Sequence, residues 1–282
     1  MNIERKPAWL RVPVSHGSHF GETSACIAAS GVATVCESAK CPNRGDCWSR
    51  GTATFMILGE VCTRNCSFCA VKHGRPDCAN ADEPKKVAEA IAKMRLKCAV
   101  ITSVTRDDLP DGGASHWADV VRAVRAAAPE TKIEILTPDF RGEKLALKTV
   151  FESRPDVFSH NAETVRRLQK SVRTLADFDT SLGVLKEAKD FGLRTKTSIM
   201  LGLGETRGEI EQCLREIRAA GADILTVGQY LRPSAENVPV ARWVEPEEFA
   251  RWGEFAKSIG FSHVKSAPLV RSSFRAHEVF EG

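Results

Sequence analysis

Hydrophobic and polar positions repeat with two different periods along residues 54–260. Short continuous apolar runs, of which residues 98–102 are an example, indicate strands that are buried on both faces. Longer stretches with apolar residues three or four positions apart indicate amphipathic helices. The pattern predicts strands over 54–58, 98–102, 132–136, 156–160, 195–201 and 223–227, and helices over 84–97, 116–128, 142–152, 163–169, 180–191, 207–220 and 246–259.

The predicted strands and helices alternate, and β/α units of this kind cross over with a right hand. Six units are too few to close the eight-stranded TIM barrel. The sequence therefore predicts an α/β fold in which residues 54–260 form a partial (βα)6 TIM-like barrel, open on one side. Residues 1–53 are expected to form a cysteine-rich N-terminal extension, and residues 261–282 a short C-terminal tail. Functional loops are expected at the carboxyl ends of the strands, as in α/β barrels generally.

Composition and charge argue against a nucleic-acid-binding, membrane-spanning or secreted protein. The 282 residues suffice for one barrel-sized domain. A net charge of +4 and a sequence pI near 8.5 fall short of the dense basic surface of a nucleic-acid-binding protein. No apolar stretch approaches the roughly 18 residues of a membrane span, and the first residues lack the apolar segment of a secretory signal. Ten cysteines, six of them clustered, favour metal binding in a reducing compartment, so we expect a cytoplasmic protein.

The first cysteine group is Cys62, Cys66 and Cys69, which directly follows the apolar run at residues 55–58. Its C-x3-C-x2-C spacing offers three thiolates to a metal site that needs four ligands. A structural zinc site would require a fourth ligand, for which His73 is the nearest candidate. A cubane iron–sulfur cluster held by three thiolates would instead leave one iron open for a ligand that is not protein.

A second group, Cys36, Cys41 and Cys47, lies fifteen residues upstream of the first. Pro42 and Gly45 predict a turn between these cysteines, which suits wrapping around a compact inorganic core. The remaining cysteines are scattered. Cys98 and Cys213 lie in apolar or amphipathic runs and are predicted to be small core residues, whereas Cys26 and Cys78 match no ligand spacing.

The two cysteine groups and several further motifs together resemble the lipoyl synthase family of the radical S-adenosylmethionine (SAM) superfamily. The downstream group alone is similar to the superfamily at large, while the upstream C-x4-C-x5-C group and Arg271-Ser-Ser-Phe274 are specific to the family. The resemblance covers about residues 6–276. The other matching segments are Gly51-Thr-Ala-Thr-Phe-Met-Ile-Leu-Gly59, Ile101-Thr-Ser-Val-Thr-Arg-Asp-Asp-Leu109, Asp111-Gly-Gly-Ala114, Asn161-Ala-Glu-Thr164, Met200-Leu-Gly-Leu-Gly-Glu-Thr206 and Gly228-Gln-Tyr-Leu231.

The resemblance implies a radical SAM sulfurtransferase with two [4Fe-4S] clusters and SAM, two SAM being consumed per lipoyl group. Cys62, Cys66 and Cys69 would hold the cluster that binds SAM and yields the 5′-deoxyadenosyl radical. Cys36, Cys41 and Cys47, joined by Ser273, would hold an auxiliary cluster that donates sulfur. The implied reaction inserts two sulfur atoms, at C6 and C8 of a protein-bound octanoyl-lysine. One departure is Phe274, where the family usually has Tyr; we expect function to survive with local hydrogen bonding changed.

Five residues are predicted to contact SAM, each beside a structural alternative. Phe68 would lie near the adenine or be a core aromatic. Ser103 belongs to a loop with hydroxyls and carboxylates for an ammonium and a ribose, or to a solvated loop. Asn161 and Glu163 would bind the ribose or amino group, or cap the next helix. Lys196 lies in a strand and needs a buried anion, either the SAM carboxylate or a structural Asp or Glu.

The resemblance also implies protein partners. These are octanoylated lipoyl carrier domains (of a 2-oxoacid dehydrogenase E2 subunit or the glycine cleavage H protein), an electron donor such as ferredoxin or flavodoxin, and an iron–sulfur assembly protein. No nucleic acid or membrane partner is expected. Two alternatives remain at this stage: another sulfur-inserting radical SAM enzyme, and a zinc-stabilised interaction module.

Overall fold

Seven parallel strands form the frame of the molecule. The computed structural model describes residues 6–12 and 19–280. The main sheet has the order β1-β2-β5-β6-β7-β8-β9-β10, and only β1 (Ala33–Thr34) runs antiparallel to its neighbour. Within the described residues the two ends of this sheet do not pair with each other, so the barrel is open. The parallel strands are β2 (Thr54–Ile57), β5 (Cys98–Ser103), β6 (Lys132–Leu136), β7 (Val157–Ser159), β8 (Thr195–Leu201), β9 (Ile224–Gln229) and β10 (His263–Ser266).

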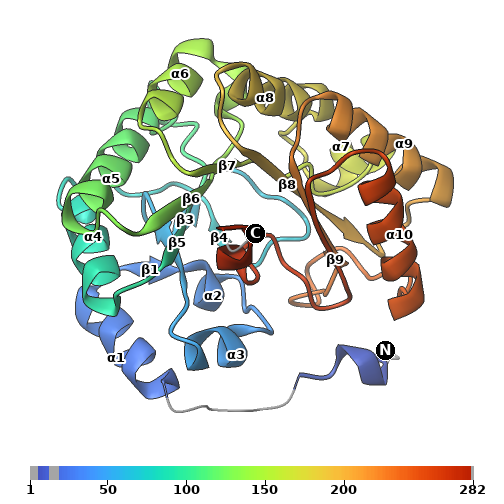
Figure 1. The fold of residues 1–282 in the computed structure, drawn as a ribbon, viewed down its shortest axis with the longest axis horizontal. Helices are drawn as coiled ribbons and strands as arrows, with labels where there is room; N and C mark the ends of the chain where they lie inside the picture. The colour runs from blue at the N-terminus through green and yellow to red at the C-terminus, as the bar shows by residue number, and fades with distance from the viewer. Residues whose placement is uncertain (1–5, 13–18, 281–282) are drawn as a thin grey trace.

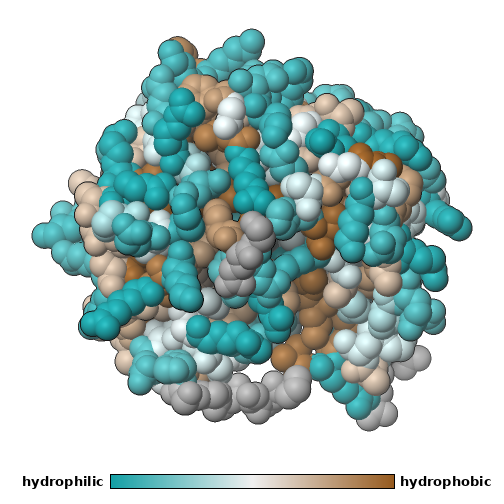
Figure 2. Space-filling view, in the orientation of Figure 1, coloured by the Kyte–Doolittle hydropathy of each residue, from teal (hydrophilic) through white to brown (hydrophobic). Residues whose placement is uncertain are grey.

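Amphipathic helices form an arc around the outside of the strands (Figure 1). They bury their apolar faces against the sheet, with Trp117, Val121 and Ile210 among the fully buried side chains. The face of the molecule seen in Figure 2 is mainly hydrophilic, with the more hydrophobic residues showing in patches between the hydrophilic ones. The helices are α4 (Glu83–Met94), α5 (Ala114–Ala127), α6 (Lys144–Glu152), α8 (Phe178–Asp190), α9 (Arg207–Ala219) and α10 (Pro246–Ser258).

The prediction of a partial barrel with six β/α units is confirmed, and two details of the prediction were wrong. The helix predicted over 163–169 does not begin there: Glu163 has a left-handed φ of 65° and forms an isolated bridge to Ile199. Helical turns follow only as η3 (Arg166–Leu168) and α7 (Gln169–Val172). In addition, β10 was not predicted; it extends the sheet beside β9, within the residues assigned to the tail.

The N-terminal region contributes short helices beside the first strands. They are η1 (Ala8–Leu10), α1 (Phe20–Ser30), α2 (Val35–Ser38) and α3 (Arg44–Ser49), and Trp48 and Ile27 form a small core between them. The predicted turn is restricted to residues 39–43, because Gly45 already belongs to α3. Residues 1–5 and 13–18 of the predicted extension, and residues 281–282 of the predicted tail, lie outside the described residues.

After β10 the chain passes into the interior of the barrel and ends in η4 (Ala276–Phe280), which lies at the centre of the helical arc in Figure 1. Val279 packs on Val157 and Ile224, the first residues of β7 and β9. The C-terminal segment therefore occupies the amino-terminal mouth of the barrel. Among the helices of the described residues, none is long and apolar enough to cross a membrane.

Candidate active site

The downstream cysteine group lies at the carboxyl end of β2. Cys62 ends the short strand β3 (Val61–Cys62), which pairs with β4 (Lys72–His73). Its Sγ accepts hydrogen bonds from the backbone N–H groups of Arg64 at 3.4 Å and Thr105 at 3.3 Å, and Cys69 Sγ accepts one from Val71 at 3.5 Å. Backbone donors aimed at sulfur stabilise thiolates and tune the potential of a bound cluster.

Arg64, inside the cysteine loop, was missed by the sequence analysis. Its guanidinium donates to both oxygens of Asp107 (2.7 and 2.9 Å) and to both oxygens of Asp139 (2.7 Å each). These carboxylates come from the loops after β5 and β6, so one side chain ties the cysteine loop to two strand ends. The arginine is 7% exposed and Asp139 is 2% exposed, which places the network in a region of weak solvent screening. The only sequence signal for this network was an arginine placed between two of the clustered cysteines.

The thiols of Cys66 and Cys69 are protonated in the metal-free protein at neutral pH. Burial raises the pKa of Cys66 to about 12, against the opposing charge of Arg173, and raises the pKa of Cys69 to about 11. Because metal ions bind thiolate, loading these two cysteines with a metal would release protons and would be favoured by a rising pH.

The zinc alternative gains no geometric support. His73, its fourth ligand, is the Cα partner of Cys62 across the β3–β4 pair, but its side chain is exposed. Within residues 6–12 and 19–280, no group of three or more His, Cys, Asp or Glu side chains is placed to hold a single metal ion. A cubane cluster spaces its thiolates more widely, because each one binds a different iron.

Three buried polar atoms near the cysteine loop lack a hydrogen-bond partner within the part of the chain that the structure describes. They are the hydroxyls of Ser103 and Thr137 and the amide oxygen of Asn161. These residues end or follow β5, β6 and β7, so they lie along the same carboxyl edge of the sheet. Buried polar atoms in native proteins are normally paired, so this edge fits a polar ligand that supplies the missing partners.

Glu163 lies between this edge and the cysteines. Its Oε1 accepts a hydrogen bond from Asn161 Nδ2 at 3.0 Å, and its charge acts on Cys66 and Cys69. Burial raises the pKa of Glu163, although Arg173 and Asn161 oppose the shift. Neither Asn161 nor Glu163 caps a helix through its side chain, so the structural alternative for this pair is not observed.

Phe68 and Lys196 have structural partners. Phe68 is partly buried and packs against the apolar cluster under α9 and α10. Lys196 Nζ donates to both oxygens of Glu134, at 2.7 and 2.9 Å, inside the barrel. The anion that a buried lysine requires is therefore Glu134, which leaves no free ammonium for a carboxylate of SAM.

The upstream cysteines lie at the opposite end of the strands. Cys36, Cys41 and Cys47 line one cavity together with Thr54, the first residue of β2. The charges of Cys36 and Cys41 both act on Cys47, whose pKa burial raises to about 12. The downstream group follows the carboxyl end of β2, whereas the upstream cavity includes the first residue of β2, so the two groups are separate sites.

The C-terminal segment completes this second cavity. Ser273 and Arg271 line it, whereas Ser272 does not, and Asn43 Nδ2 donates to the backbone oxygen of Leu269 at 2.7 Å. The close approach depends on Gly228 in β9, because a Cβ at that position would collide with the carbonyl oxygen of Val270. The fold thus brings together residues that lie more than 200 positions apart in the sequence.

Of the two cysteines predicted as core residues, one prediction is confirmed and one is wrong. Cys213 is 2% exposed within the apolar cluster beneath α9. Cys98 is only partly buried and lines the upstream cavity, because it starts β5 on the interior face of the sheet. All ten cysteines are free.

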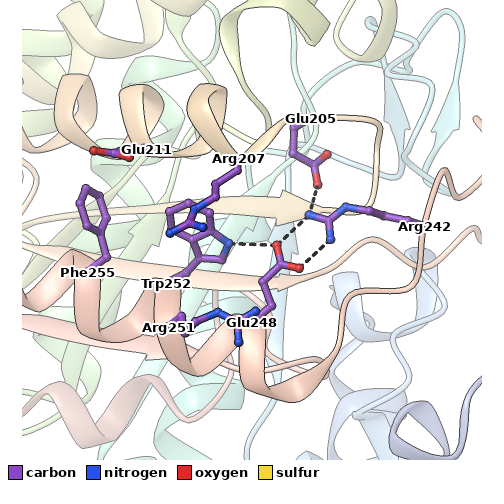
Figure 3. Close-up of a pocket in the computed structure, with 8 residues that line it drawn as sticks. All are labelled: Glu205, Arg207, Glu211, Arg242, Glu248, Arg251, Trp252 and Phe255. Carbon is purple, nitrogen blue, oxygen red and sulfur yellow. Dashed lines mark hydrogen bonds and ion pairs between the residues drawn. The ribbon is translucent and has the colours of Figure 1, made fainter.

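A separate cavity of about 360 Å³ lies outside the barrel, between α9 and α10 (Figure 3). Arg242 donates to Glu248 at 2.7 and 2.8 Å and lies 3.7 Å from Glu205, and Trp252 donates to Glu248 at 3.2 Å. The polar groups of these side chains are thus paired with one another. None of the predicted site residues lines this cavity.

Relatives named lipoyl synthase match nearly the whole chain. The one from Pyrobaculum arsenaticum is 54% identical over 280 residues, which cover 98% of this chain and 95% of the relative. The one from Rubrobacter xylanophilus is 51% identical over 278 residues, which cover 98% of this chain and 87% of the relative. The chain belongs to the lipoyl synthase family. The predicted family and enzyme class, a radical SAM sulfurtransferase, are thereby confirmed.

The superfamily and the fold agree with this membership. The radical SAM superfamily model matches residues 56–217. Methylornithine synthase (PylB) aligns with a TM-score of 0.55 at 14% identity, covering 87% of this chain and 78% of that one. SuiB of Streptococcus suis, bound to its precursor peptide SuiA, aligns with a TM-score of 0.59 at 10% identity, covering 92% of this chain and 55% of that one. These likenesses concern the fold alone.

Membership of the lipoyl synthase family implies SAM and iron–sulfur chemistry, and the described residues fit both. The unpaired hydroxyls and amide along the carboxyl edge suit a polar cofactor, and each cysteine group offers three soft ligands in a partly enclosed site.

Proposed function

We propose that the protein inserts two sulfur atoms, at C6 and C8, into an octanoyl chain carried on a lysine of another protein. The observation that carries the proposal is the pair of separate three-cysteine sites, one at each end of the barrel strands, with Ser273 lining the upstream one. A single cluster would serve radical formation alone, whereas the second site provides a place for the sulfur source.

At the downstream site, Cys62, Cys66 and Cys69 would hold a [4Fe-4S] cluster. Bound there, the cluster and SAM supply the one-electron cleavage that yields methionine and a 5′-deoxyadenosyl radical. Arg64 holds the loop to the barrel, and the N–H groups of Arg64, Thr105 and Val71 stabilise sulfur charge.

The SAM-facing residues would be Ser103, Asn161 and Glu163, with Phe68 beside the adenine. The hydroxyl of Ser103 and the amide oxygen of Asn161 are buried and lack a hydrogen-bond partner among the described residues. Glu163 accepts a proton more readily than an exposed carboxylate because burial raises its pKa. Lys196 is left out of the proposed contacts, since Glu134 already pairs with it.

At the upstream site, Cys36, Cys41, Cys47 and Ser273 would hold a second [4Fe-4S] cluster, which we propose as the sulfur donor. A serine oxygen is a harder ligand than thiolate and leaves iron more easily. Ser273 therefore marks the corner of the site at which an iron is freed when sulfur is given up.

The substrate would be an octanoylated lipoyl carrier domain, of a 2-oxoacid dehydrogenase E2 subunit or a glycine cleavage H protein. The net charge of +4 gives weak long-range attraction to an acidic domain. We further propose a cytoplasmic setting, an electron donor such as ferredoxin or flavodoxin, and an iron–sulfur assembly protein. Ten free cysteines agree with a reducing compartment.

Two matched triple variants test whether the two cysteine groups have separate functions. Replacing Cys62, Cys66 and Cys69 by Ala should leave about four irons and abolish cleavage of SAM, because SAM loses its anchoring iron. Replacing Cys36, Cys41 and Cys47 by Ala should also leave about four irons, but retain SAM cleavage while forming no lipoyl product. Iron analysis and quantification of 5′-deoxyadenosine check both. Normal SAM cleavage in the first variant, or lipoyl formation in the second, would refute the assignment.

A further inference from the structure

The upstream cavity is lined by positive charges as well as by thiols. Three arginines line it, whereas no aspartate or glutamate of the described residues does. The arginines are Arg44, Arg271 and Arg275. Like charges gathered in a partly enclosed site repel one another, so a cavity with cations and no carboxylate fits an anionic guest better than a neutral one.

Two of these arginines already have an acidic partner near the surface. Arg44 Nη1 lies 3.6 Å from Glu37 Oε1, and Arg275 Nη1 lies 3.6 Å from Glu278 Oε1. The side chains of the two arginines are 45% and 40% exposed, so water also solvates their charges. Neither arginine therefore needs a partner inside the cavity.

Arg271 has no such acidic partner. Within the described residues its guanidinium pairs with no carboxylate, and its one hydrogen bond runs from Nη1 to the carbonyl oxygen of Val270 at 2.7 Å. The same nitrogen lies beside Gly228 of β9, where an added Cβ would be 3.3 Å from it. The guanidinium is thus held against the barrel wall, and its other N–H groups remain available to the cavity.

The charge that acts on Arg271 is that of a cysteine. Cys41, which also lines the cavity, favours the ionised guanidinium, whereas burial lowers the pKa of Arg271. The guanidinium therefore lies close enough to the upstream cysteines for their charges to interact. In the metal-free protein it is a partly buried cation without a carboxylate, an arrangement that costs free energy unless an anion is bound.

We propose that Arg271 is a positioning residue of the upstream site, whose guanidinium balances the negative charge of the cluster and donates hydrogen bonds to its sulfur atoms. The inference rests on the proposed function, because it requires a cluster on Cys36, Cys41 and Cys47. Net charge and hydrogen bonds to sulfur are two of the means by which a protein sets the potential of such a cluster. Arg271 binds no iron itself, so this role is compatible with the release of an iron at Ser273.

The test uses a background in which Cys62, Cys66 and Cys69 are Ala, so that only the upstream site binds iron. In this background Arg271→Met keeps the length of the side chain and removes its charge, whereas Arg271→Lys keeps the charge and loses the planar set of donors. Arg44→Met is the matched control, because Arg44 lines the same cavity but has its own carboxylate. After anaerobic reconstitution, the reduction potential is measured by a titration followed by electron paramagnetic resonance, and the rate of iron loss is measured with a chelator.

We expect a more negative reduction potential in Arg271→Met than in the background protein, because a cation beside the cluster stabilises its reduced form. Iron should leave about tenfold faster, as the loss of one hydrogen bond to a charged group implies. Arg271→Lys should restore most of the potential, and Arg44→Met should change neither quantity. An unchanged potential in Arg271→Met, or an equally negative one in Arg271→Lys, would overturn the inference. Absence of any cluster in the background protein would instead refute the upstream site, and with it the proposed function.

A second measurement needs no cluster and distinguishes a charge that awaits an anion from a merely structural arginine. Urea denaturation of metal-free Arg271→Met should give a midpoint equal to or above that of the metal-free background protein, because a cation without a counter-charge has been removed. If Arg271→Met then binds no cluster at all, its intact metal-free stability still supports the inference. A midpoint below that of metal-free Arg44→Met would show a structural role and overturn it.

Discussion

The guanidinium of Arg64 reaches two carboxylates, on Asp107 and Asp139, that come from loops after different strands. Burial opposes ionisation of Asp139, but its hydrogen bonds to Arg64 and the charge of that guanidinium lower the pKa of Asp139 to about 2. A carboxyl group in an unfolded chain titrates near 3.9. The ionised form is therefore favoured by folding, and the network stabilises the cysteine loop before any metal binds.

Asp139→Asn should lower the free energy of unfolding at pH 7 by about 2–3 kcal/mol, because that is the linkage value of such a shift. Because the pKa is depressed on folding, the contribution is fully present above about pH 4 and is lost as the pH falls through about 2. Urea denaturation of the metal-free protein between pH 7 and pH 3 should show the gap between wild type and variant narrowing below pH 4.

Asp179→Asn is the matched control. Asp179 also binds an arginine through both oxygens, Arg166 at 2.7 and 2.8 Å, but its side chain is 70% exposed. Exposed pairs contribute about 0–1 kcal/mol, so this variant should change little at any pH. A loss for Asp139→Asn no larger than for Asp179→Asn, or a gap that stays constant down to pH 3, would contradict the role given to Arg64.

The sequence alone identified the cysteine groups, whose spacing is a local signal. It did not identify residues whose role depends on a hydrogen-bond partner from a distant part of the chain. The cysteine spacings were readable because they are local. Lys196 pairs with Glu134, and Arg64 pairs with two aspartates. These carboxylates come from distant strands or the loops after them, so no local sequence pattern indicates the pairs. Cys98 was assigned to the core because its run is apolar, but a strand that lines an open cavity is apolar too.

At the scale of elements, the C-terminal segment completes the barrel as well as the upstream site. Strand β10 extends the sheet, and the following residues enter the interior and end in η4. Lys265 pairs with Glu278 at 2.6 Å and donates to the backbone oxygen of Arg275 at 2.9 Å, while Arg194 donates to that of Val279 at 3.0 Å. These contacts hold the segment that carries Ser273.

Gly228→Ala should displace this segment, because the added methyl group would collide with the carbonyl oxygen of Val270. We expect a loss of about 1–3 kcal/mol from overpacking and a selective fall in iron at the upstream site. Hydrogen exchange of residues 267–280 and iron content in the Cys62, Cys66 and Cys69 to Ala background check both effects.

Gly183→Ala is the matched control, since no atom lies within 4 Å of an added Cβ there and alanine favours the interior of helix α8. It should leave upstream iron unchanged and stability equal or higher. If Gly228→Ala showed unchanged hydrogen exchange and a full complement of iron at the upstream site, the position of the C-terminal segment would not depend on its close contact with Gly228.

Element prediction succeeded where periodicity was strong and failed where short segments depend on distant pairing. The six β/α units followed from alternating apolar runs and amphipathic stretches. The helix expected at 163–169 did not form at its start, because the backbone N–H of Glu163 bonds to Ser198 of the neighbouring strand instead. Strand β10, only four residues long and partly exposed, offered no clear apolar signal.

At the scale of the whole molecule, the open barrel places the two cysteine sites at opposite ends of the same strands. The downstream loop follows β2 at the carboxyl edge, and the upstream cavity is built on the first residues of β2 and β5 with the C-terminal segment across it. Under the proposed function, a substrate chain that enters the barrel between the two sites would meet radical formation on one side and a sulfur source on the other. This arrangement could not be read from spacing alone, since it depends on the return of the C-terminal segment through the barrel.

The most direct test of this account is a single anaerobic turnover experiment. Reconstituted protein is incubated with SAM, a reductant and an octanoylated lipoyl carrier domain, and the carrier is analysed by mass spectrometry. The account predicts that the octanoyl-lysine gains two sulfur atoms while two SAM are consumed per lipoyl group formed. A carrier that gains no sulfur although 5′-deoxyadenosine accumulates, or an equal yield from free octanoate, would contradict it.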